Sequence, residues 1–156
     1  MALTRGVAHL AFLLAVLVSG GALGPATAAA TELDDYLWQR RPLLLFAPTD
    51  RDPRLAETLN RIEVDRCDVD DRDMVIGVVV TEGTSTLDGR ALSADQSRRL
   101  KDRYAIDDSA FTAVLIGKDG GEKLRIDDVP DLHTVYAVID GMPMRSREMT
   151  DGPGRC

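Results

Sequence analysis

The stretch RPLLLFAPTDRDPRLAETLNRI, residues 41–62, contains the pattern that decides the fold. Within it, Leu43–Ala47 is a continuous apolar run with the length of a strand that is buried on both faces. Pro48 ends this run, and Asp52 then stands where an N-cap is wanted, with Pro53 at the first helical position. Apolar residues follow at helical spacing, at Leu55, Leu59 and Ile62. The stretch therefore predicts a buried strand that leads into a short amphipathic helix.

Downstream of this stretch the patterns of strand and helix continue. Met74–Val80 is a second apolar run rich in Val and Ile, and Thr81–Leu92 reads as a loop. Ser93 and Gln96 form a capping box that opens a second helix. The remaining patterns predict a short helical lead-in, two strands of a hairpin and a last helix, at Leu33–Gln39, Phe111–Ile116, Glu122–Ile126 and Asp131–Gly141.

This succession predicts an α/β fold with a central mixed sheet in βαβαββα order, flanked by helices. Right-handed crossovers make the first two strands parallel neighbours, and the final hairpin adds an antiparallel half to the same sheet. That order is thioredoxin-like.

Three blocks of sequence carry a resemblance that agrees with this order. They are RPLLLFAP at 41–48, VLIGKDGGEKLR at 114–125 and DGMPMRSREM at 140–149. With them the chain resembles, over residues 33–150, a family of exported bacterial proteins of unknown function with a thioredoxin-like, peroxiredoxin-related domain. Similar domains occur in secreted animal sushi-repeat and matrix-associated proteins. The resemblance implies a fold and no agreed activity.

Residues 1–30 are typical of a secretory signal peptide. Arg5 is their only formal charge, Leu10–Val18 is apolar, and small residues near Ala28 and Ala30 suit cleavage. The alternative is a retained anchor, but this run is far shorter than the roughly 20 residues that span a bilayer as a helix. We therefore expect a periplasmic or secreted domain at residues 31–150, with no membrane span after cleavage and a flexible tail at 151–156.

The length of the chain indicates the number of domains, and its charge indicates which partners it can bind. The length of 156 residues is that of one domain. The formal net charge of -7 argues against nucleic acid as a partner, because a protein that binds nucleic acid needs a basic face. An anionic membrane surface would also repel it.

The cysteines are Cys67 and Cys156, and an oxidising compartment leaves two possibilities open for them: a structural bridge, or thiols that are unpaired or pair by chance. Peroxiredoxins carry Pro, a hydroxyl residue four positions on and the reactive Cys seven positions on. Here Pro48 matches, while Asp52 and Leu55 stand at the other two positions. Peroxide reduction by the standard route is therefore not expected.

The surroundings of Cys67 favour a structural cysteine. It follows the first predicted helix, whose C-terminus is the negative end, and acidic residues surround it, so both effects should raise its pKa. The acidic run Asp65–Asp73 lacks the spacing of a calcium loop and reads as a solvated loop.

Other chemistry has weaker signals. After loss of the leader His133 is the only imidazole, and it has no nucleophile motif beside it. The glycine-rich stretch at 117–121 reads as a hairpin turn rather than a phosphate cradle. We predict no cofactor and no metal site. One alternative is a copper carrier, with Cu(I) held by Met142, Met144 and Met149, and His133 as a further ligand.

We therefore expect an exported, non-catalytic binding module whose partner is a protein or an envelope component. Its candidate ligand surface is the turn at the position of the active site in thioredoxin-like enzymes, together with the segment that carries Arg145 and Arg147. The turn residues are Thr49, Asp50, Arg51 and Asp52. The main alternative is a divergent thiol oxidoreductase that acts through Cys67, with Cys156 as its resolving partner.

Overall fold

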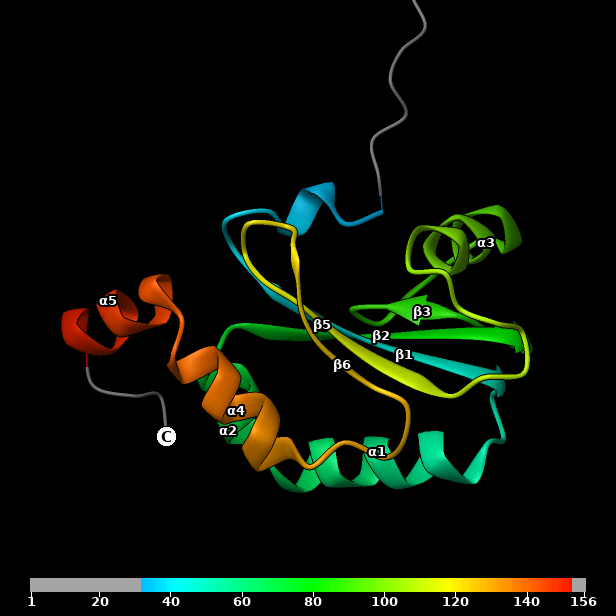
Figure 1. Ribbon diagram of the computed structural model, residues 1–156, viewed down its shortest axis with the longest axis horizontal. Helices are drawn as coiled ribbons and strands as arrows, with labels where there is room; N and C mark the ends of the chain where they lie inside the picture. The colour runs from blue at the N-terminus through cyan, green and yellow to red at the C-terminus, as the bar shows by residue number, and fades with distance from the viewer. Residues whose placement is uncertain (1–31, 153–156) are drawn as a thin grey trace, which may run out of the picture.

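The computed structural model describes residues 32–152, and Figure 1 shows how its elements are arranged. The expected signal peptide and Cys156 lie outside the described residues. Along the chain the elements are η1 (Asp34–Tyr36), β1 (Arg41–Thr49), α1 (Pro53–Val64), α2 (Arg66–Asp71), β2 (Met74–Glu82), β3 (Thr86–Leu87), β4 (Arg90–Ala91), α3 (Ala94–Arg103), β5 (Thr112–Ile116), β6 (Glu122–Ile126), α4 (Leu132–Asp140) and α5 (Pro143–Asp151).

The sheet has six strands in the order β4-β3-β2-β1-β5-β6. Strand β1 pairs parallel with β2 and antiparallel with β5, which in turn pairs with β6. This confirms the predicted mixed sheet. The apolar run of β1 lies at its centre, where both faces of the strand are covered and a continuous hydrophobic sequence is required.

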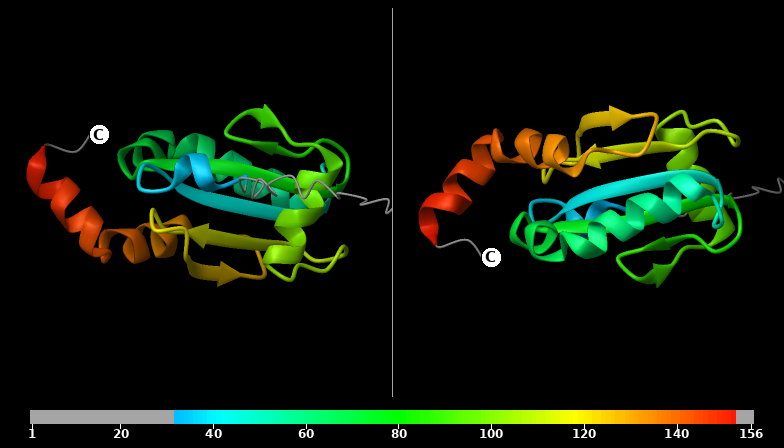
Figure 2. Two further views of the ribbon diagram at one scale, coloured as in Figure 1. Left: turned by 90° about the horizontal axis from the view of Figure 1, so that it is seen from above. Right: turned by 90° about the horizontal axis from the view of Figure 1, so that it is seen from below.

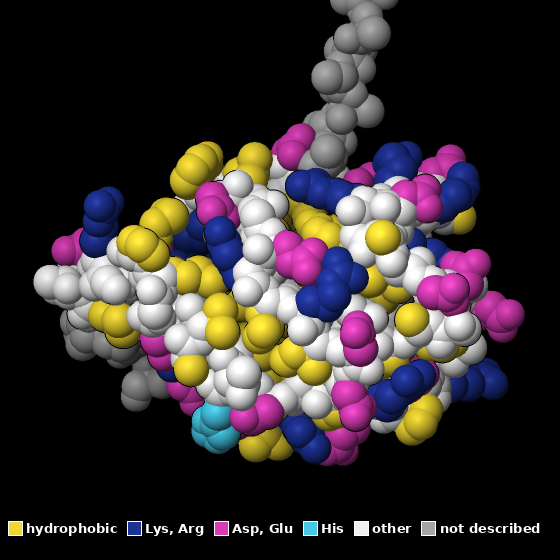
Figure 3. Space-filling view, viewed as in Figure 1, with side chains coloured by type: hydrophobic (Ala, Val, Ile, Leu, Met, Phe, Trp, Pro, Cys, Tyr) yellow, Lys and Arg dark blue, Asp and Glu magenta, His cyan; other side chains and the backbone are white. Residues whose placement is uncertain are grey.

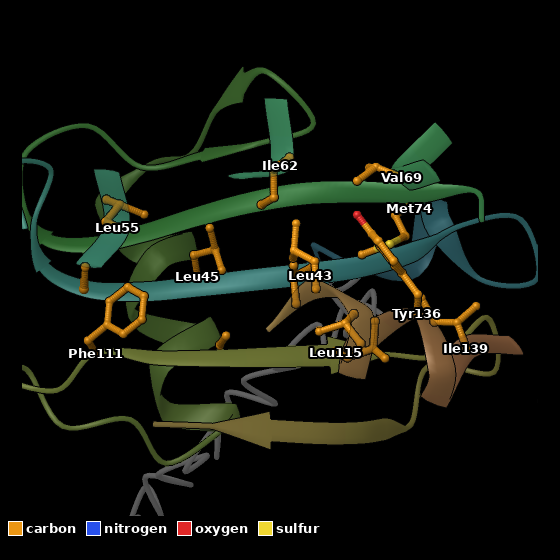
Figure 4. Packing of buried hydrophobic residues seen from close by; sticks show 14 of the residues in the cluster. Leu43, Leu45, Leu55, Ile62, Val69, Met74, Phe111, Leu115, Tyr136 and Ile139 are labelled. Carbon is orange, nitrogen blue, oxygen red and sulfur yellow. The ribbon is translucent and has the colours of Figure 1, made fainter. Parts of the chain in front are cut away.

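Helices cover both faces of the sheet. Helices α1, α2 and α4 lie on one face, while η1 and α3 lie on the other (Figures 1 and 2). Each face has its own core, because alternate residues of β1 point to opposite sides. Figure 4 shows the first core, where α1, α2 and α4 pack against Leu43 and Leu45 of β1. The second core contains Leu44 and Phe46, together with Leu100 of α3 and Tyr104, the residue that follows this helix.

Helix α1 begins as predicted and buries Leu55 and Ile62 as expected, but Thr58 takes the place of Leu59 in the core. Its buried residues are Leu55, Thr58 and Ile62, whereas Leu59, which was expected in the core, is exposed. Thr58 is tolerated there because its hydroxyl donates to the carbonyl oxygen of Arg54 at 2.7 Å.

The segment between β2 and α3 is more ordered than the predicted loop. It contains the β3–β4 hairpin, whose two-residue turn is Asp88-Gly89. Both residues have positive φ, 52° and 74°, as a type I′ turn requires, and an Asp-Gly pair is a favoured sequence for it. The Asp-Gly pair is visible in the sequence, but the strands beside it have only two residues each, too few to show the alternation of apolar and polar residues that indicates a strand.

Two polar segments form helices that were not predicted. The acidic run expected to be a loop contains α2, and the segment after Gly141 expected to be a tail contains α5, with Pro143 in its first turn. Among residues 32–152, no helix is long and apolar enough to cross a membrane.

Candidate functional site

The predicted ligand surface lies at the edge of the sheet where β1 and β2 end. These strands are parallel, so their carboxyl ends meet at the same edge. From that edge the chain continues into α1 on one face and, after the β3–β4 hairpin, into α3 on the other (Figure 2). Ligands of open α/β sheets bind in the crevice at such a point. Thr49–Asp52 forms the link between β1 and α1, and the structure keeps these four residues together there.

Asp52 is committed to the start of α1. It is buried, its Oδ1 accepts the backbone N–H of Arg54 at 2.8 Å, and this makes it the N-cap. The Arg54 side chain donates to both carboxylate oxygens, with Nε 3.0 Å from Oδ1 and Nη2 2.7 Å from Oδ2. These side-chain hydrogen bonds hold the pKa of Asp52 below its usual range. A fixed carboxylate therefore occupies the helix N-terminus.

The position that matches the reactive cysteine of peroxiredoxins is part of the core. Leu55 is almost fully buried and packs in the cluster that also contains Phe111. The Arg54 guanidinium lies over the Phe111 ring, 5.1 Å from its centroid, and covers this corner from outside. The apolar side chain of Leu55 thus fills the position of the reactive cysteine, and the Asp52–Arg54 ion pair covers it.

The other three predicted residues form a tight turn. The Thr49 hydroxyl accepts the backbone N–H of Arg51 at 3.2 Å, and the N–H of Asp50 donates to the carbonyl of Glu82 at 3.2 Å. Asp50 also lies against Gly83, where φ is 117° and a Cβ atom would come within 2.5 Å of the Asp50 carboxylate. Asp50 and Arg51 are exposed, so they are the part of this surface that a partner could contact.

A groove of about 600 Å³ lies beside the turn, between the end of β2 and α3. Its lining includes the hydroxyl residues Thr81, Ser85 and Ser97. Lys101 of α3 donates to the Thr81 hydroxyl at 3.0 Å and forms an ion pair with Asp108. This groove offers hydrogen-bond donors and acceptors over a largely polar wall.

A second groove, of about 440 Å³, lies between the start of α1 and the start of β5. Arg54, Phe111 and Arg125 are among its lining residues, and Ile106 lines both grooves. The α3–β5 connection therefore separates the two. Sequence reasoning missed both grooves, because their walls come from segments that are distant in the chain and share no local motif.

The described cysteine is not at this edge. Cys67 follows the C-terminal end of α1, as expected, but it lies in the first turn of a further short helix, α2, rather than in a loop. It is disulfide-bonded, and its acidic neighbours are as expected. The other cysteine of the sequence, Cys156, lies outside the described residues.

The acidic run Asp65–Asp73 is not a solvated loop. Asp68 pairs with Arg72 at 2.9 Å, Asp71 with Arg145, and Asp73 with Lys118 at 2.9 Å. The remaining members also have partners, with Arg66 lying 3.8 Å from Asp70 and the Tyr136 hydroxyl 3.4 Å from Asp65. In Figure 3, too, acidic and basic side chains intermingle over the face shown, so that face carries no broad field of one sign.

The methionines of the copper alternative are spread along the end of the chain. Met142 packs in part against the first core, Met144 is half-buried and Met149 is exposed. His133 is exposed on α4, with its ring edge-on to Tyr136. Within residues 32–152, no three His, Cys, Asp or Glu side chains gather as a metal site would require.

A mixed sheet in this strand order, with helices on both faces, is a thioredoxin-like fold. A reduced 2-Cys peroxiredoxin of Plasmodium vivax superimposes with a TM-score of 0.54 at 13% sequence identity, over 74% of this chain and 84% of that protein. Residues 32–148 match the family described as "Domain of unknown function (DUF4174)", and the chain belongs to that family.

A curated relative extends the comparison to vertebrates. The coiled-coil domain-containing protein 80 of Danio rerio is 24% identical over 133 residues, which cover 75% of this chain. This chain spans about 15% of the length of that relative. The match therefore concerns one part of a much longer protein.

Proposed function

We propose that this domain is an exported, non-catalytic binding module for a protein or an envelope component. The observation that carries the proposal is the Asp52–Arg54 ion pair, which occupies the N-terminus of α1 where a thiolate would need to be. Leu55 is buried beneath this pair, so an apolar side chain stands where peroxiredoxins carry their reactive thiol.

The two grooves support a binding role for the same edge of the sheet. They lie on either side of the α3–β5 connection, and Asp50 and Arg51 are exposed between the ends of β1 and β2. A partner that contacts the turn would thus meet polar walls next to it. We propose that recognition is made through this turn and these grooves.

Export is proposed on the pattern of residues 1–30. The same localisation would follow from the resemblance of residues 41–48, 114–125 and 140–149 to exported bacterial proteins and to secreted sushi-repeat and matrix-associated proteins. Expression of the full chain followed by N-terminal sequencing of the product would locate the cleavage, which we expect after Ala28 or Ala30.

Two activity assays separate the module from the alternative thiol oxidoreductase. Peroxide consumption and insulin reduction are measured for the full chain and for Cys67→Ser. We expect both proteins to give the same negligible rate. Turnover in the full chain that Cys67→Ser abolishes would favour the oxidoreductase.

Binding at the turn is tested by a photo-crosslinking residue placed at Asp50, with Glu63 at the far end of α1 as the matched exposed control. In the host organism we expect a discrete crosslinked product from position 50 and none from position 63. Equal products from both positions, or none from either, would contradict the proposal.

A further inference from the structure

The groove between the end of β2 and α3 has small side chains on its two main walls. Thr81 lines the β2 wall, and Ala94 and Ser97 line the α3 wall from one face of that helix. Its volume of about 600 Å³ is in the range that holds a small molecule or a short peptide segment. Gly83 also lines the groove and lies against Asp50, so the groove is next to the turn proposed for binding.

Lys101 is a largely buried cation that lines this groove. Only 13% of its side chain is exposed, and its ammonium donates to the Thr81 hydroxyl at 3.0 Å and forms an ion pair with the Asp108 carboxylate. The Thr81 hydroxyl donates in turn to the carbonyl oxygen of Asp108 at 3.0 Å. The Asp108 side chain, in contrast, is 74% exposed. The ammonium is therefore fixed in the wall, whereas the carboxylate that neutralises it lies mostly in water.

The other largely buried lysine, Lys118, is neutralised differently. Its ammonium lies 2.9 Å from the Asp73 carboxylate and 2.7 Å from the Glu148 carboxylate. Both of these acidic side chains are themselves mostly shielded from water, so Lys118 keeps its partners inside the domain. An ion pair with an exposed carboxylate contributes little to stability. The Asp108 carboxylate can therefore be exchanged for another carboxylate on Lys101 at little cost.

The charges along the groove favour a carboxylate as the incoming group. Arg98 and Lys101 line it together with Asp102 and Asp108, so the lining side chains carry no net formal charge. A carboxylate that replaces Asp108 on Lys101 adds a single negative charge, whereas a phosphate group would add about two beside Asp102. The groove is therefore better matched to an acidic side chain than to a phosphorylated one.

We propose that Lys101 is the carboxylate-binding group of this surface: an Asp or Glu side chain of a protein partner lies in the groove, replaces the Asp108 carboxylate and pairs with the Lys101 ammonium. This inference rests on the proposed binding function, because it names the group of the partner that the groove receives. Lys101 then keeps its bond to Thr81, and the displaced Asp108 side chain turns into solvent. Asp108 thus competes with the partner, so its removal should strengthen binding.

The test is an NMR titration of the full chain, isotope-labelled, with synthetic peptides at constant ionic strength. Acetyl-Gly-Glu-Glu-Gly-amide has carboxylates on its side chains alone, and acetyl-Gly-Gln-Gln-Gly-amide has none. We expect the glutamate peptide to give saturable shifts at the amides of residues 81–85 and 97–102, and the glutamine peptide to give none. Equal shifts with both peptides would contradict the proposal.

Substitutions of the two paired residues are expected to act in opposite directions. Asp108→Asn should bind the glutamate peptide about fivefold more tightly, because it removes the competing carboxylate from a mostly exposed position and so leaves the fold intact. Lys101→Gln should bind it about tenfold more weakly. Lys123→Gln is the matched control, because Lys123 also pairs with an aspartate, Asp119 at 2.6 Å, but does not line the groove. It should bind like the parent chain.

The proposal would be overturned if Asp108→Asn bound the glutamate peptide no more tightly than the parent chain, or if Lys101→Gln bound it equally well. Free glutarate that bound as tightly as the peptide would also overturn it, as would a phosphoserine peptide that bound more tightly. Crosslinking from position 50 tests the binding function separately. A discrete product from position 50 without peptide binding would refute the Lys101 site alone, and peptide binding without that product would contradict contact at the turn alone.

Discussion

At each end of β1 an arginine binds both oxygens of a carboxylate, but one pair is partly exposed and the other is buried. At the carboxyl end, Arg54 binds both oxygens of Asp52, and the Arg54 side chain is 41% exposed. At the amino end, Arg41 binds both oxygens of Glu148, and the Arg41 side chain is 1% exposed. Both pairs are bidentate, and they differ mainly in burial, so we expect burial to decide how much each pair contributes to stability. Water can replace the partner of Arg54 but cannot reach Arg41.

The largest effect is expected from Glu148→Ala. The substitution leaves Arg41 buried without its carboxylate partner, which should lower the free energy of unfolding by about 3 kcal/mol. Urea denaturation measures this, with Met149→Ala as the control on the exposed side of the same helix. If Glu148→Ala lowered the free energy of unfolding no more than Met149→Ala does, burial would not strengthen the Arg41–Glu148 pair.

A smaller effect is expected from Leu55→Cys in a Cys67→Ser, Cys156→Ser background. The shortened side chain leaves a cavity in the first core and should cost about 2 kcal/mol. The new thiol should also react slowly with hydrogen peroxide, because the Asp52 carboxylate lies beside this position and raises the thiol pKa. Adding Asp52→Thr removes that charge, and we expect about tenfold faster trapping of sulfenic acid by dimedone. Equal trapping rates with and without Asp52→Thr would show that the carboxylate does not control this corner.

Strong local patterns explain why the central fold could be predicted. Leu43–Ala47 and Met74–Val80 form the adjacent buried strands β1 and β2, as their continuous apolar runs indicate. Helix α5 was missed because it has few apolar residues. It is fixed instead by pairs such as Arg145 with Asp71, which are 74 residues apart in the chain and leave no periodic signal.

The candidate site was predicted in part for the same reason. The turn at Thr49–Asp52 is local, so sequence alone could place it after the first strand and give Asp52 its role as a helix cap. The ring of Phe111 beneath Arg54 comes from a distant segment, as do the walls of both grooves. These features depend on tertiary packing, which no local pattern records.

Acid should expose the contribution of Asp52. Its pKa is held below the ordinary value by the Arg54 side chain, so the stabilisation is complete above pH 3.8 and is lost as the pH falls through the lowered value. Asn can still cap the helix, but Asp52→Asn removes the charge-assisted hydrogen bonds with Arg54 and should cost about 1 kcal/mol near neutral pH. Urea unfolding from pH 7 to pH 2 should show this difference shrinking in acid. Parallel curves for the two proteins would mean that the carboxylate charge adds nothing to the cap.

The smallest effect is expected from Glu122→Ala, which tests the role of burial directly. Arg125 donates to both oxygens of Glu122, from Nε at 2.9 Å and from Nη2 at 2.8 Å, so this pair is bidentate like the Arg41–Glu148 pair. About a third of each side chain is exposed, however, and water can solvate Arg125 once the carboxylate is gone. We therefore expect a loss of no more than about 0.5 kcal/mol in urea unfolding. A loss as large as that of Glu148→Ala would mean that bidentate geometry, rather than burial, sets the strength of these pairs.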